Sequence, residues 1–107
     1  MLEPVRLAKV FMHGKCAGIL EEWVANRKYR FVYIDGYEGP PISLTMPTAK
    51  ATHEFSRFPA FFDGLLPEGE MLEGLLRQQK IDRYDSFAQL MAVGSELVGA
   101  VTVEEIL

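Results

Sequence analysis

Apolar and polar residues alternate with the two-residue period of β-strands over the first third of the chain. Residues 5–13 and 16–20 are two largely apolar runs, and the short His-Gly-Lys sequence at their junction has the length of a hairpin turn. Residues 29–34 alternate cleanly between two faces, and Asn26 with its polar neighbours breaks the chain before them. The pattern predicts a three-stranded antiparallel meander.

Two later segments also have the composition of strands. Residues 42–46 place Ile42, Leu44 and Met46 on one side, and prolines precede and follow this segment. Because proline cannot donate to a central ladder, we predict a short strand near an edge of the sheet. His53 is expected in the loop that follows. Residues 97–103 are apolar and rich in β-branched side chains, which predicts a final strand.

Between these segments the apolar residues recur at helical spacing. A first helix is predicted after Ser56, a suitable N-cap, and its phenylalanines Phe58, Phe61 and Phe62 follow the i, i+3, i+4 pattern. Gly64 has the position of the C′ residue that ends such a helix.

Two further helices are predicted. One runs from about Glu68 to Gln79, and its apolar stripe consists of Met71, Leu72, Leu75 and Leu76. A third, short helix is capped by Asp85 or Ser86 and stopped by Gly94. The order of strands, helices and a strand predicts an α+β fold in one domain, residues 1–107: a small, mostly antiparallel sheet (the N-terminal meander plus two later strands) packed against about three short helices.

Composition narrows the class of protein. The chain has 107 residues, of which 49% are hydrophobic and 24% charged, the balance of an ordinary globular domain. Lys and Arg number 11 against 15 Asp and Glu, which gives a net charge of −4. Such a chain lacks the basic face that phosphate contacts require, so we expect no direct DNA binding.

The sequence contains no recognisable catalytic or metal-binding group. His13 and His53 have no neighbours at metal-ligand spacing, and residues 94–99 have the glycines of a phosphate loop without its Lys-Ser/Thr. Cys16 is the single cysteine and is expected to be a buried, inert thiol. No apolar run is long enough for a membrane span or a signal peptide. We expect a cytoplasmic protein with no catalytic residue, metal or cofactor.

Two features have more than one explanation at this point. The segment FFDGLLPEGE, residues 61–70, is an apolar and acidic connection between the first two predicted helices. Glu68 and Glu70 there are also explained by a favourable interaction with the helix dipole. Trp23 is predicted in the connection between the second and third strands, where it either covers one end of the core or forms an interface hot spot.

Three segments together resemble the N-terminal subdomain of HipA-type serine/threonine kinases, the toxins of bacterial toxin–antitoxin modules. They are PISLTMP (41–47), FPAFFDGLLPEG (58–69) and SFAQLMAVGSELVGAVTV (86–103). The opening hairpin, with VFMHGKCAGIL, is similar to the first two strands of that family. The resemblance runs in order over nearly the whole chain.

The resemblance implies a free-standing copy of this subdomain, because the sequence ends at Leu107, where a HipA kinase continues into its catalytic parts. Such copies occur in three-component modules of the HipBST type, where the small HipS protein accompanies the kinase HipT and the DNA-binding protein HipB. A non-catalytic antitoxin that binds and neutralises a HipT-like kinase, in a larger complex with a HipB-like helix-turn-helix protein, is therefore expected. The alternative is an activating or structural subunit that completes the kinase fold in trans.

The same resemblance places the segment between the first two helices on the side that faces the kinase. Phe61 and Phe62 are expected to anchor the first helix in the core. For Leu65 and Leu66 two roles remain open, a contact with the kinase or a place in the core. The candidate partner-binding residues are Asp63, Gly64, Leu65, Leu66, Pro67, Glu68, Gly69 and Glu70.

Overall fold

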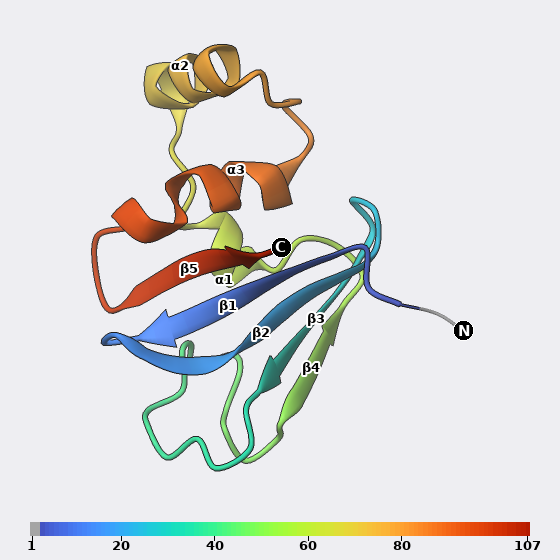
Figure 1. Ribbon diagram of the computed structural model, residues 1–107, viewed down its shortest axis with the longest axis vertical. Coiled ribbons are helices and arrows are strands. Elements are labelled where there is room, and N and C mark those ends of the chain that lie inside the picture. Colours follow the sequence, from blue (N-terminus) through green and yellow to red (C-terminus); the bar gives the residue numbers. More distant parts are fainter. Residues whose placement is uncertain (1–2) are drawn as a thin grey trace.

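A five-stranded antiparallel sheet organises the part of the chain that the computed structural model describes, residues 3–107 (Figure 1). Its strands lie in the order β4-β3-β2-β1-β5, and every neighbouring pair is antiparallel. Their bounds are β1 Arg6–Met12, β2 Lys15–Val24, β3 Lys28–Tyr33, β4 Thr52–Phe55 and β5 Val101–Ile106. The predicted meander and the predicted α+β fold are confirmed.

The helices form a second layer. They are α1 (Ala60–Asp63), α2 (Gly69–Gln79) and α3 (Ser86–Val93), and α3 continues into the 3₁₀ helix η1 (Gly94–Glu96). In Figure 1, α3 lies beside the sheet and α2 lies beyond α3, so α2 is the helix farthest from the sheet. No helix in residues 3–107 combines the length and apolar character needed to cross a bilayer.

The core lies between the sheet and the helices. Alternate residues of the strands point into it, and Phe62, Phe87 and Leu90 close it from the helical side, all without exposed surface. Phe31 of β3 and Phe62 of α1 meet with ring centroids 6.2 Å apart. Gly18 of β2 permits close packing, because a Cβ there would lie 2.4 Å from the carbonyl oxygen of Val32.

The predicted strand at residues 42–46 is wrong, because this segment is a closed turn. Ile42 and Met46 are buried at its two ends, and Leu44 at its tip is 95% exposed. The hydroxyl of Tyr33 joins the two ends, accepting from the backbone N–H of Ile42 at 3.0 Å and donating to the carbonyl of Met46. A turn can thus produce the same alternation as a strand, and the flanking prolines favour the turn.

The strand that does pair with β3 is β4, which contains His53, a residue expected in a loop. Two other strand boundaries also differ from the prediction. β2 extends to Val24, so Trp23 lies within a strand and not in a connection. β5 begins at Val101 and not at residue 97.

The helices follow the prediction more closely. Asp85 caps α3, since its carboxylate accepts from the backbone N–H of Ala88 at 3.1 Å. The first helix is shorter than predicted, because its N-cap is Pro59 and not Ser56. Gly64 follows that helix with φ −66°, a right-handed conformation. The prediction that Gly64 is a C′ glycine, which would be left-handed, is therefore wrong. The left-handed glycine of this region is Gly69, at φ +59°.

Candidate protein-binding surface

The eight candidate residues run from the last residue of α1 through the connection to the first two residues of α2, a segment that we call the elbow (residues 63–70). Its first part is a series of tight turns: the N–H of Gly64 donates to Ala60, that of Leu65 to Phe62, and that of Leu66 to Asp63, at 3.0 to 3.1 Å. The elbow is therefore held in shape by its own hydrogen bonds.

The second part of the elbow straightens and then turns into α2. Glu68 is extended, with φ −127° and ψ 165°, and its side chain forms no capping hydrogen bond. Gly69 is left-handed at φ +59°, a region that strongly favours glycine. This glycine sets the direction in which α2 leaves the elbow.

The apolar side chains of the elbow are half-buried. Leu65 and Leu66 pack against the core, next to the fully buried Phe62, but each keeps some exposed surface. Phe61 is half-buried too, and its ring meets that of Phe62 with centroids 5.1 Å apart. The leucines thus anchor the elbow and also contribute to its outer surface.

The acidic side chains of the elbow are exposed. Asp63, Glu68 and Glu70 all face solvent, and Glu70 lies in the first turn of α2, where the helix dipole favours a carboxylate. The elbow therefore presents a fixed backbone with half-buried leucines and free carboxylates.

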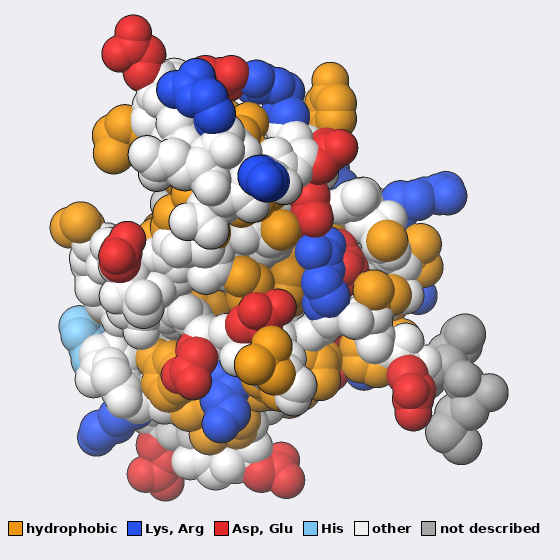
Figure 2. All heavy atoms as spheres, turned by 45° about the horizontal axis from the view of Figure 1, so that its top comes forward, with side chains coloured by type: hydrophobic (Ala, Val, Ile, Leu, Met, Phe, Trp, Pro, Cys, Tyr) orange, Lys and Arg blue, Asp and Glu red, His pale blue; other side chains and the backbone are white. Residues whose placement is uncertain are grey.

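A groove continues this surface between α2 and the end of α3. Its volume is about 300 Å³, and its walls are formed by Pro67, Glu70, Met71, Gly74, Leu75, Gln78 and Val93. Met71 is 76% exposed there. Figure 2 shows charged side chains gathered at the end of the molecule that carries α2, with apolar side chains reaching the surface beneath them.

A cluster of charged residues that sequence reasoning missed joins the sheet to α3. The guanidinium of Arg6 on β1 donates to both carboxylate oxygens of Glu22 on β2, at 2.6 and 2.8 Å. It also donates to both oxygens of Asp85, at 3.1 and 2.8 Å, and lies 4.8 Å from the ring centroid of Phe87. Tyr29 on β3 donates to Glu22 at 3.2 Å.

The charges of this cluster stabilise one another. Burial alone would raise the pKa of Glu22, but the hydrogen bonds from Arg6, from the N–H of Asn26 and from Tyr29 hold this pKa below its ordinary value. The pKa of Asp85 is lowered in the same way. Burial alone would raise this pKa, but the hydrogen bonds from Arg6 and from the N–H of Ala88 hold it below its ordinary value. Burial, with the adjacent carboxylate of Glu22, raises the pKa of Tyr29.

This cluster has a structural role. Its four side chains satisfy one another and link three strands to the N-terminus of α3, leaving no free group for chemistry. The sequence does contain a signal for it, because Arg6 and Glu22 stand at positions whose strand neighbours, Ala8 and Leu20, point into the core. A charged residue at such a position predicts a buried partner.

Trp23 lies on the opposite side of β2 from the core. Its indole N–H donates to Glu21 at 2.8 Å, and the guanidinium of Arg30 lies 4.7 Å from its ring centroid. It is half-buried and does not cover an end of the helical core. Leu7, Phe11, Ile19 and Val32 are half-buried at the other outward positions of the strands.

Possible metal ligands are dispersed. Among residues 3–107 no group of three or more His, Cys, Asp or Glu side chains is arranged to hold a metal ion. Cys16 is half-buried in β2, less enclosed than the sequence predicted, and its thiol faces the carbonyl of Gly18 at 4.0 Å.

Comparison with known proteins identifies the domain. A family model described as the HipA N-terminal domain matches residues 8–104. The chain belongs to the HipA N-terminal domain family. A solved structure described as the N-terminal domain of HipA toxin superposes with a TM-score of 0.76 at 28% identity, covering 100% of this chain and 98% of that one. The resemblance inferred from the sequence is confirmed.

A curated relative has nearly the same extent as this chain. It is an uncharacterized protein of Haemophilus influenzae (strain ATCC 51907 / DSM 11121 / KW20 / Rd), 36% identical over 106 residues. The alignment covers 98% of this chain and 97% of that protein. The similarity therefore extends over almost the full length of both chains.

Proposed function

We propose that this protein is a non-catalytic antitoxin of the HipS type, which binds a HipT-like serine/threonine kinase in trans and neutralises it. The observation that carries the proposal is the match of residues 8–104 to the HipA N-terminal domain, in a chain that aligns over 97% of its Haemophilus relative. The kinase partner is inferred from the likeness of this domain to the N-terminal domain of HipA toxin. The full assembly includes a HipB-like helix-turn-helix protein.

The elbow is the proposed kinase-binding surface. A kinase cleft must be positively charged to hold the phosphates of ATP, and the exposed carboxylates Asp63, Glu68 and Glu70 complement such a cleft. The hydrogen-bonded turns fix Leu65 and Leu66 before binding, so little conformational entropy is lost on association. The elbow therefore combines charge complementarity with preorganisation.

The test is Leu66→Asp, with binding to the purified kinase measured by calorimetry and the melting temperature measured on the same sample. Loss of a hot-spot contact should cost about 2 kcal/mol, roughly a thirtyfold loss of affinity. Leu44→Asp is the matched control, since Leu44 is an exposed leucine in a different turn. Early melting of Leu66→Asp with unchanged binding of the folded fraction would show that the leucine is only a core residue.

The alternative function is an activating or structural subunit that completes the kinase fold in trans. It is favoured by the close superposition on a domain that is named as part of a toxin. Co-expression with the kinase separates the two functions. Restored growth supports neutralisation, whereas greater toxicity supports completion of the kinase.

We further propose that the protein acts in the cytoplasm and reaches DNA only through its helix-turn-helix partner. The net charge of −4 provides little attraction for phosphates. The isolated protein should leave operator DNA unshifted on a native gel. A shift that disappears as the salt concentration rises would contradict this.

A further inference from the structure

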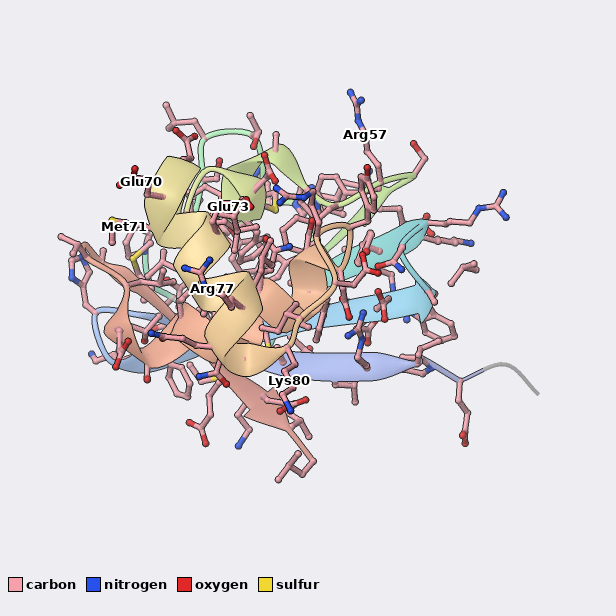
Figure 3. The ribbon with its side chains drawn as sticks, turned by 90° about the horizontal axis from the view of Figure 1, so that it is seen from above. Arg57, Glu70, Met71, Glu73, Arg77 and Lys80 are labelled. Carbon is pink, nitrogen blue, oxygen red and sulfur yellow. The ribbon has the colours of Figure 1, made fainter. Side chains whose placement is uncertain are left out.

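Helix α2 carries a stripe of charged residues whose sign changes along the helix. Glu70 and Glu73 lie in its first half, and Arg77 and Lys80 lie in its last turn and at its C-cap. Steps of three and four residues keep all four on one side of the helix, and all four are exposed. In Figure 3 they follow one another along α2, which is nearest the viewer.

This side of α2 is also open. No residue of α2 is buried, and the half-buried Leu76, three residues after Glu73 and four before Lys80, borders the stripe along one edge. A Cβ built on Gly74, which borders the stripe beside Glu70 and Arg77, meets no atom within 4 Å. The missing side chain at Gly74 would let another helix approach closely.

The order of the charges is self-complementary about Leu75. Glu73 and Arg77 lie two residues to either side of Leu75, and Glu70 and Lys80 lie five residues to either side. A two-fold axis at this level would place a second α2 antiparallel, with each glutamate opposite a basic residue of the other copy. A parallel arrangement would instead bring like charges together.

We propose that α2 is a self-association surface through which two copies of this chain pair antiparallel. Both glutamate–basic pairs would form twice in the symmetric dimer, as an isologous interface requires. Gly74 of each copy lies beside the axis, and the exposed Met71 packs against the aliphatic part of Gln78 from the other copy. This surface is separate from the kinase-binding proposal, except that Glu70 borders both.

The expected association is weak. A helix of 11 residues is only about 16 Å long, so the pair buries less than the roughly 800 Å² per partner of a stable interface. Exposed ion pairs add little to affinity and are screened by salt. We therefore expect a dissociation constant on the order of 100 µM at low ionic strength.

The experiment is sedimentation velocity on the intact protein and on two charge-reversed variants. Glu70→Lys/Glu73→Lys makes the stripe wholly basic, and Arg77→Glu/Lys80→Glu makes it wholly acidic. Each variant alone should associate at least tenfold more weakly than the wild type, because like charges face each other. An equimolar mixture of the two should form heterodimers, and added salt should dissociate them.

A further variant is Arg83→Ala, which frees the stripe residue Glu73 from its ion pair with Arg83 in the same chain. It should associate at least as strongly as the wild type, because Glu73 is then free to pair with Arg77 of the other copy, and circular dichroism should show equal helix content in all variants. A wild type that remains monomeric at about 1 mM in low salt would overturn the proposal. Failure of the mixed variants to associate would also overturn it, whatever the kinase experiments give.

Discussion

Arg6 occupies an inward-facing position of β1, whereas the other inward-facing positions of this strand carry apolar side chains. Arg6 is tolerated there because Glu22 and Asp85 each accept two of its hydrogen bonds. Asp85 as a helix cap was predictable, since a cap depends on residues only a few positions away. Its bond to Arg6 was not predictable, because 79 residues separate the two in sequence.

The first prediction is that Arg6→Ala is strongly destabilising. It leaves the carboxylate of Glu22 buried without its cation, which should cost about 3–5 kcal/mol of unfolding free energy. Arg30→Ala is the matched control, because it breaks a more exposed ion pair with Glu21 and should cost less than about 1 kcal/mol. Urea denaturation of both variants measures the difference, and similar losses would contradict a special role for the buried cluster.

The second prediction concerns acid. The pKa values of Glu22 and Asp85 are lowered in the folded protein, so their stabilising effect is present above the unfolded pKa values, near 4, and is lost as the pH falls through the folded ones. The unfolding free energy should therefore decrease as the pH falls below about 5. Asp85→Asn keeps a capping side chain but removes one charge.

This variant should be less stable than the wild type at neutral pH and should show a weaker pH dependence. The two stability curves should approach each other in acid, where Asp85 of the wild type is protonated. Urea denaturation across the acidic range tests this. Parallel curves would exclude Asp85 as a source of the pH dependence.

At the scale of elements, periodicity predicted the helices and the meander but misassigned one turn. Residues 42–46 alternate as a strand does, yet the buried ends Ile42 and Met46 are joined through Tyr33. The true partner of β3 is β4, which has only four residues and includes His53 and Glu54. So short a strand offers too little alternation to be found from the sequence.

The third prediction compares two glycines of the elbow. Gly64→Ala should be neutral or stabilise by up to about 1 kcal/mol, because Gly64 is right-handed and an added Cβ makes only ordinary contacts at 3.5 Å. Gly69→Ala should destabilise by about 1–2 kcal/mol, because φ is +59°. Thermal melts of the two variants test this, and equal melting temperatures would contradict the assigned turn geometry.

Across the whole molecule, the burial of side chains decreases from the central strands of the sheet to α2. The central strands have fully buried side chains, such as Val10 and Phe31, whereas α2 has none and lies against α3. The elbow and its acidic residues could be found from the sequence, because their signal is local. The position of α2 away from the sheet could not be predicted from the sequence, because it depends on the packing of α3 between α2 and the sheet.

The fourth prediction follows from this gradient. Local opening of α2 should require less free energy than global unfolding, because little buried apolar surface is lost. Its backbone amides should exchange with deuterium faster than those of β1 to β3, which hydrogen-exchange mass spectrometry can measure. Equal protection of α2 and the central strands would show that the helix is held as firmly as the sheet.

Trp23 gives this protein a built-in optical reporter. It is the single tryptophan of the sequence, and it lies on the sheet face opposite the helices, stacked against Arg30. Its fluorescence emission should therefore follow the integrity of the sheet, while far-ultraviolet circular dichroism also follows the helices. Recorded together on the unlabelled protein, the two signals distinguish loosening of the helical layer from unfolding of the whole domain.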